Sequence, residues 1–223
     1  GGSAGREGPI VQIGASLGSS FATRLGLPTN RVVLLATCGS AAGIAATFHA
    51  PLAGAVFALE VILLQFSAEA FGYTVISAVM ASIVARALQG DAPLVDLHET
   101  LAFTSLPDMG WVAVAGLLSG LAGLGFSKML YGVEDVIAWI RGRLHLPEWA
   151  RPGVLGVVLG LGLLAFPVLY GSGYPIQLDA LHGRYTIAVL LLLALGRAIF
   201  TAWTIGIGGS GGVFAPTLFI GAM

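Results

Sequence analysis

The sequence predicts an all-α membrane protein with several spans and with broken, re-entrant helices. Of its 223 residues 57% are hydrophobic and only 9% are charged, whereas soluble domains carry about 25% charged residues. Too few polar residues are present to cover a soluble core of this composition, and lipid imposes no desolvation penalty on uncharged side chains. The 33 glycines are scattered through apolar segments, where they let helices approach closely and let backbones break inside protein.

Four helices are expected in the first part of the chain. The first, residues 9–25, starts at a proline, which is favoured at the first helical position, and at about 17 residues it is marginal for a hydrocarbon layer of ~30 Å. Residues 31–48 form a helix rich in alanine and glycine, and residues 51–66 form another that starts at a proline. Residues 68–88 span the membrane, and an acidic loop follows at 90–108.

The second part alternates long apolar segments with glycine breaks. Residues 110–141 are long enough to cross obliquely, and after a basic loop the next spans are expected at 153–170 and 185–205. A glycine break and a short helical piece separate those two spans. A second glycine-rich break, residues 206–212, precedes a helix that begins at Val213. The positive-inside rule places the basic loop in the cytoplasm and the acidic loop outside.

Two helix starts share one design, a glycine-rich turn followed by a proline and an apolar helix. One is Gly5-Arg6-Glu7-Gly8-Pro9 and the other is Gly212-Val213-Phe214-Ala215-Pro216. Interrupted helices in corresponding places of two halves indicate a transporter binding site. A helix N-terminus carries unpaired N–H donors and about half a positive charge, and glycines let the backbone aim several donors at one point. Such a site binds an anion weakly enough to release it.

Glu7 lies at one of these helix starts and is a candidate gate. Its carboxylate is itself an anion, so it can occupy the position meant for the permeating ion. Protonation would neutralise the side chain and free the position, which makes Glu7 a proton acceptor as well. The alternative is a carboxylate that only caps its helix at the membrane surface, where the helix dipole stabilises it.

Three motifs in order resemble the CLC family of chloride channels and transporters. They are Gly5-Arg6-Glu7-Gly8-Pro9 with Val11-Gln12-Ile13-Gly14, then Phe48-His49-Ala50-Pro51-Leu52-Ala53-Gly54 with Phe57 and Glu60, and then Gly212-Val213-Phe214-Ala215-Pro216 with Leu218-Phe219-Ile220-Gly221. Their order and spacing agree with the family over all 223 residues. The resemblance implies two inverted repeats and one pore in each subunit of a homodimer. Residues 1–89 would then be the latter part of the first repeat and residues 108–223 the first part of the second, in a domain truncated at both ends.

The resemblance also implies the roles of individual residues. The backbone amides of Val213 and Phe214 would hold a central anion, and Arg6, Glu7, Gly8 and Ala215 would line an outer site. Residues 51–66 and the neighbouring helix would contribute to the dimer interface. Residues 171–175 resemble the family's selectivity loop, but their place before the second binding helix makes them its repeat-related counterpart, away from the anion. The selectivity loop itself and the pore tyrosine are expected outside both ends of this chain.

Glu60 and Val61 bear on proton coupling. Proton-coupled members of the family carry a glutamate at the position of Val61, whereas family channels carry valine. A proton that crosses the inner half of the membrane needs a titratable relay, so Val61 favours a channel or uncoupled transport over a chloride/proton antiporter. Glu60 is a possible member of a proton path, although a buried structural carboxylate paired with a polar neighbour is the favoured interpretation.

Alternatives from other classes receive little support. Ser210, in Gly208-Gly209-Ser210-Gly211, fits the GxSG pattern of intramembrane serine proteases, but that chemistry needs a histidine base and only His49 lies in an apolar segment. A fluoride-selective relative is a further possibility, although residues 213–216 fit the chloride branch better. Arg197 lies deep in its span and needs an internal partner.

No enzyme activity, cofactor or metal site is expected, because the histidines and the single cysteine share no ligand spacing. The net charge of −1 gives no electrostatic basis for binding nucleic acid. The expected partners are chloride or a similar monovalent anion, the lipid bilayer and a second copy of the chain, in the plasma membrane.

Overall fold

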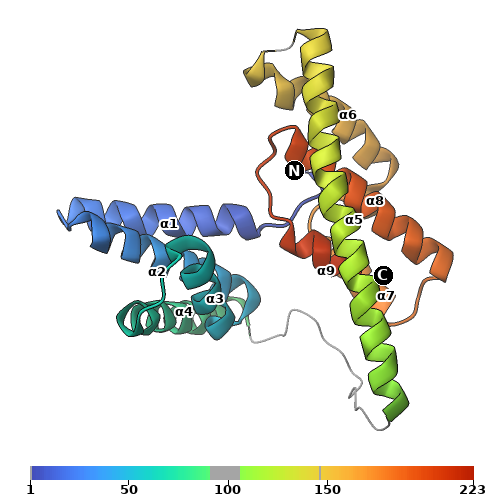
Figure 1. Ribbon diagram of the computed structural model, residues 1–223. Coiled ribbons are helices and arrows are strands. Elements are labelled where there is room, and N and C mark those ends of the chain that lie inside the picture. The colour runs from blue at the N-terminus through green and yellow to red at the C-terminus, as the bar shows by residue number, and fades with distance from the viewer. Residues whose placement is uncertain (1, 91–105, 146) are drawn as a thin grey trace. The chain divides into compact units, whose positions relative to one another are not determined.

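The computed structural model describes residues 2–90, 106–145 and 147–223, and every regular element within them is a helix (Figure 1). The all-α fold class is therefore confirmed, whereas most of the acidic loop expected at 90–108 lies outside the described residues. In chain order the helices are α1 (Glu7–Arg24), α2 (Thr29–Phe48), α3 (Pro51–Phe57), the π-helix η1 (Ala58–Leu63), α4 (Ala68–Gln89), α5 (Leu106–Leu144), the 3-10 helix η2 (Glu148–Ala150), α6 (Arg151–Ala165), the 3-10 helix η3 (Pro167–Leu169), α7 (Tyr174–Leu181), α8 (Ile187–Gly206) and α9 (Phe214–Ala222).

The chain forms two compact units. One contains Gly1–Arg6 together with Leu97–Met223, and the other contains Glu7–Asp96. The first few residues of the chain thus belong with its second half. The repeat boundaries inferred from the sequence, 1–89 and 108–223, stay a prediction.

Five helical segments in the described chain are long and apolar enough to cross a membrane. They are α2, α4, residues Met109–Leu144 of α5, residues Glu148–Ala165 and α8. Four of them overlap spans expected from the sequence, and α2 overlaps the segment expected there only as a helix, residues 31–48. Helix α1, with 18 residues, is not among them.

Helices α1 and α2 pack with their backbones in contact. A Cβ atom added at Gly14 would lie 2.1 Å from the carbonyl oxygen of Gly39, and one added at Gly39 would lie 2.0 Å from the oxygen of Gly14. One turn further along α1, a Cβ at Gly18 would lie 2.1 Å from the oxygen of Leu35. Small residues that let helix backbones approach in this way are typical of membrane helix pairs.

Substituting Gly39 with alanine is expected to destabilise the protein, because the new methyl group has no space and the facing backbone must move. Overpacking of this kind costs about 1–3 kcal/mol, occasionally more. Thermal unfolding in detergent, followed by size-exclusion chromatography, measures the change. Gly72→Ala on α4 is the matched control, since nothing lies within 4 Å of a Cβ there. Equal unfolding temperatures for the two variants would contradict the packing argument.

The segment after Pro51 changes helix type part-way. Pro51 is the first residue of α3, where its missing N–H costs nothing, but α3 ends at Phe57 and continues as the π-helix η1 over Ala58–Leu63. Leu64 then adopts the left-handed conformation with φ of 56° and ends the helix. The single helix expected at 51–66 is thus shorter and contains a π segment, a feature often found at functional sites.

In the other unit, α5, α6 and α8 enclose a cluster of large aliphatic side chains. Its buried members are Ile137, Leu155, Leu159, Leu163, Leu169 and Ile207. Helix α6 ends at Ala165, because Phe166 precedes a proline and leaves the helical conformation, with φ of −127° and ψ of 70°. The span expected at 153–170 is therefore an α-helix up to Ala165, followed by the 3-10 turn η3.

Candidate functional site

An antiparallel bridge joins Gly5 to Gly212. The amide of Gly5 donates to the carbonyl of Gly212 at 2.9 Å, and the amide of Gly212 donates back to Gly5 at 2.8 Å. Both glycines belong to the first unit. Two segments more than 200 residues apart in sequence therefore lie side by side, and each is one of the two glycine-rich turns that the sequence singled out (Figure 1).

The two helices that follow the bridge begin at equivalent positions. Helix α1 starts at Glu7, two residues after Gly5, and α9 starts at Phe214, two residues after Gly212. Pro9 and Pro216 are each the third residue of their helix, where the sequence interpretation had placed Pro9 first. A proline is tolerated there because the first N–H groups of a helix have no partner within it. The same unpaired N–H groups make each start attractive to an anion.

The segment before α1 is held at two further points. The buried amide of Ser3 donates to Oγ1 of Thr204 on α8 at 3.1 Å. The amide of Gly171 donates to the carbonyl of Gly2 at 3.0 Å. With the Gly5–Gly212 bridge, these bonds fix residues 2–5 along their length against the second half of the chain.

Arg197 is fully buried and has the internal partners that its depth required. Its Nη1 donates to the carbonyl of Leu169 at 3.1 Å and its Nη2 donates to that of Ser172 at 3.0 Å. Its guanidinium also lies 5.2 Å from the ring centroid of Phe219 on α9. The planar, multidentate guanidinium suits such a bridge between two carbonyls and an aromatic face. Arg197 thus connects the loop before α7 to α9.

The remaining predicted residues of this unit flank the bridge. Arg6 is exposed, and its guanidinium carbon lies 5.9 Å from the ring centroid of Tyr174, the first residue of α7. Val213 is the N-cap of α9, and Phe214, like Val213, is partly exposed, whereas Ala215 is fully buried. The structure therefore brings Arg6, Val213, Phe214 and Ala215 into one unit at the helix start.

Glu7 and Gly8 belong to the other unit, as the first two residues of α1. The Glu7 side chain is only 6% exposed, and within the described part of the chain neither carboxylate oxygen accepts a hydrogen bond. A buried polar group without a partner is costly and often marks a function. A helix cap at the membrane surface would instead be exposed to water, so that alternative fits the burial of Glu7 poorly.

Glu60 lies in the π-helix η1 and is exposed, as is Val61. The buried structural carboxylate favoured by the sequence interpretation is not matched by this exposure, and the role of Glu60 stays a prediction. Glu60 instead lines a hollow of about 400 Å³ with Val56, Leu59, Leu64, Gln65 and Phe66. The π-helix makes this position unusual, and the residue pattern gave no sign of it.

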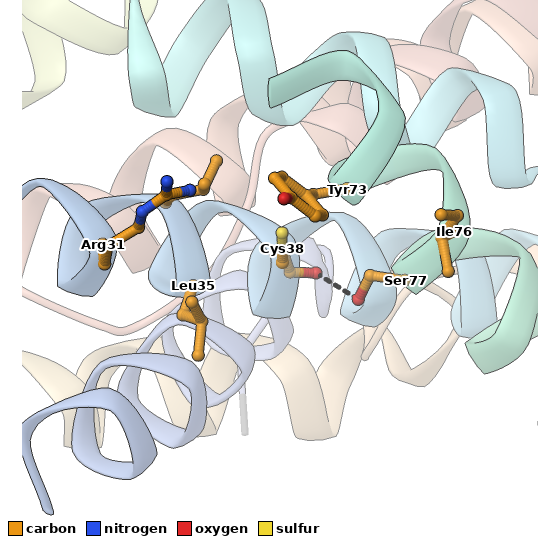
Figure 2. Close-up of a pocket in the computed structure, with 7 residues that line it drawn as sticks. Arg31, Leu35, Cys38, Tyr73, Ile76 and Ser77 are labelled. Carbon is orange, nitrogen blue, oxygen red and sulfur yellow. Dashed lines mark hydrogen bonds between the residues drawn. The ribbon is translucent and has the colours of Figure 1, made fainter. Parts of the chain in front are cut away.

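Two other features do not contribute to the site. Ser210 is exposed in the loop before α9, and between described residues no hydrogen bond joins its side chain to a histidine. A hollow of about 260 Å³ between α2 and α4 is lined mainly by apolar groups, with Ser77 donating to the carbonyl of Cys38 at 3.0 Å (Figure 2). It contains none of the predicted site residues.

Sequence reasoning missed the contribution of α8. Thr201 and Thr204 follow Arg197 at helical spacing in an otherwise apolar helix, and all three are buried. That spacing was the available signal for a polar inward face. It was missed because only Arg197 carries a charge.

The comparison with known families decides the assignment. The family model described as "Voltage gated chloride channel" matches residues 1–223. The chain belongs to this family, called CLC below. A CLC relative, "H(+)/Cl(-) exchange transporter ClcA" of Vibrio parahaemolyticus, is 35% identical over 223 residues, which cover 98% of this chain and 47% of the relative. A ClcB-like CLC protein of Ralstonia nicotianae is 34% identical over 229 residues, which cover 100% of this chain and 52% of the relative.

Solved CLC structures share the fold. The structure of a slow cyanobacterial Cl−/H+ antiporter matches with a TM-score of 0.83 and 29% identity, covering 99% of this chain and 51% of that one. The structure of a CLC-type fluoride/proton antiporter matches with a TM-score of 0.74 and 28% identity. The match covers 97% of this chain and 53% of that one. The chain thus spans about half the length of the CLC proteins it matches. The broken helices inferred from the sequence are those of the CLC fold.

Proposed function

We propose that this chain supplies part of the pathway by which chloride or a similar monovalent anion crosses a membrane, with Glu7 as the gate. The observation that carries the proposal is the Gly5–Gly212 bridge. Two helices begin two residues after its two glycines, so each helix start is tied to the bridge by a short piece of chain. Their unpaired N–H groups offer an anion a site that requires no fixed cation.

Glu7 would compete with the anion for this site. The amides from Arg6 to Gly8 and of Ala215 would line its outer part, and those of Val213 and Phe214 its centre. An ionised Glu7 carboxylate is attracted by the same helix starts and excludes the anion, whereas a protonated one is neutral and leaves. The burial of Glu7 without a hydrogen-bond partner supports this role, because a side chain that must leave its position cannot be held there by strong bonds.

We further propose uncoupled passage, because Val61 cannot relay a proton through the inner half of the membrane. Chloride/proton exchange is the second candidate, and the printed names of the Vibrio relative and of the cyanobacterial structure favour it. In that case Glu60, exposed and adjacent to Val61, is the residue of this chain that would carry the proton.

Proteoliposomes containing the full-length protein distinguish the two candidates. A chloride gradient is imposed while chloride and pH are recorded together, and uncoupled passage predicts chloride flux without uphill proton movement. Uphill proton movement would establish exchange instead. Glu60→Gln would then be expected to abolish most proton movement, while Glu69→Gln, an exposed carboxylate paired with Arg31, would leave it unchanged.

We also propose that the protein works as a homodimer, with α3, η1 and α4 contributing to the interface. These elements carry large exposed apolar side chains, including Leu52, Val61 and Ile76. Cross-linking in native membranes tests the assembly, and a monomer at every cross-linker concentration would contradict it.

A further inference from the structure

One residue outside the anion site contacts both segments that lead to the two helix starts, one through its side chain and the other through its main-chain carbonyl. Thr204 lies near the end of α8 and is buried. Its Oγ1 accepts the hydrogen bond from the amide of Ser3 at 3.1 Å and donates to the carbonyl of Phe200 at 2.7 Å. The second bond fixes the rotamer of the hydroxyl, so its acceptor lone pair is directed at Ser3.

The methyl group of Thr204 packs against the same segment. A Cβ atom added at Gly2 would lie 2.5 Å from Cγ2 and 2.9 Å from Oγ1 of Thr204. The backbone at Gly2 is therefore pressed against the threonine side chain with no room for a methyl group. Hydrogen bond and packing together define where residues 2 and 3 lie along α8.

The carbonyl of Thr204 holds the other segment. It accepts a hydrogen bond from the amide of Gly209 at 3.0 Å, and a Cβ at Gly209 would lie only 2.5 Å from that oxygen. Gly209 opens the loop that reaches the bridge at Gly212 and then α9. Thr204 thus contacts both segments that carry the bridge. Gly5 and Gly212 each lie within three residues of a residue that Thr204 contacts.

We propose that Thr204 is a positioning residue for the gate. By fixing Ser3 it sets the start of the short segment Ser3–Arg6, and Glu7 follows this segment directly in the chain. The proposal rests on the proposed function of Glu7. Loss of the Thr204 hydroxyl leaves the buried Ser3 amide without its acceptor and loosens the segment, so the Glu7 carboxylate competes less well with the anion.

The test measures the ratio of anion flux at neutral pH to flux at acidic pH in proteoliposomes of the full-length protein. Thr204→Val keeps the shape but removes the acceptor, and we expect the ratio to rise by ~2- to ~10-fold, the range that one hydrogen bond spans in an equilibrium. Thr204→Ser keeps the hydroxyl and should restore the wild-type ratio. Thr74→Val is the matched control, since Thr74 is buried on α4 and donates to the carbonyl of Ala70 at 2.9 Å.

A merely structural role is separated by repeating the measurement in the Glu7→Gln background. Thr204→Val should have no further effect on the ratio there, because its action passes through Glu7. An effect that persists in that background would overturn the proposal, as would a wild-type ratio for Thr204→Val. If Thr204→Val has the wild-type ratio, anion flux in Glu7→Gln would still be independent of pH as long as the proposed function holds. Failure of the Thr204 proposal can therefore be distinguished from failure of the proposed function.

A second variant covers the case in which Thr204→Val does not fold. Gly2→Ala leaves the hydroxyl in place but adds a methyl group 2.5 Å from Cγ2 of Thr204. It should displace the same segment and raise the ratio in the same direction. Combining it with Thr204→Ser removes Cγ2 and should return the ratio towards the wild-type value. An unchanged ratio in Gly2→Ala would overturn the proposal.

Discussion

Replacing Glu7 with glutamine is expected to make anion flux nearly independent of pH. Glutamine has the shape of the protonated glutamic acid but cannot ionise, so the competitor for the anion is permanently neutral. In the wild type, flux should fall by up to about tenfold per pH unit as the gate loses its proton. In the variant the flux at neutral pH should remain near the acidic maximum. Proteoliposome flux across a pH series measures both curves.

The control for Glu7 is an exposed carboxylate. Glu148→Gln removes a charge that pairs with Arg141 outside the candidate site, and it should keep the wild-type pH dependence. A Glu7→Gln protein whose flux still falls with rising pH would remove Glu7 from the gating role. The helix-cap interpretation would then be the better account of this residue.

Replacing Arg197 with methionine is expected to cause the largest loss of stability among the substitutions considered. The variant leaves the buried carbonyls of Leu169 and Ser172 without their donors. Two hydrogen bonds from a charged group contribute about 1.5–3 kcal/mol each, so a loss of roughly 3–6 kcal/mol in the free energy of unfolding is expected. Thermal unfolding in detergent and the yield of monodisperse protein are the measurements.

Two comparisons test the account of Arg197. Arg143→Met alters an exposed arginine on α5 and should change stability by no more than about 0.5 kcal/mol. Arg197→Lys should remain well below the wild type, because a single ammonium cannot reproduce the planar fork that reaches two carbonyls. Wild-type stability of Arg197→Lys would show that charge alone, without this geometry, supports the loop.

Most of the helices were predictable because local sequence signals mark where they begin. Prolines at 9 and 51 and the glycine breaks lie within three residues of the observed helix starts. Two segments differ from the expectation, and helix propensity predicts neither difference. Pro167 ends α6 earlier than expected, and η1 is a π-helix although its residues would suit an ordinary α-helix. Glu60 was expected to be buried because a carboxylate in an apolar stretch needs a partner, whereas it is exposed within this chain.

The candidate site was only partly predictable. The two glycine-rich turns could be recognised from their composition, and the resemblance related them to each other. Their pairing through Gly5 and Gly212 depends on atoms more than 200 residues apart, which no local pattern encodes. The same is true of the partners of Arg197, two main-chain oxygens whose residue types, leucine and serine, carry no signal for a cation.

The Gly5–Gly212 bridge consists entirely of main-chain atoms, and this has a consequence for how such proteins diversify. Genetic change replaces side chains and leaves peptide groups in place, so the hydrogen bonds of the bridge are insulated from most point mutations other than those to proline. Among descendants of this sequence, changes in ion preference or transport rate should therefore accumulate in the side chains around the bridge. The main-chain hydrogen bonds of the bridge itself should be retained.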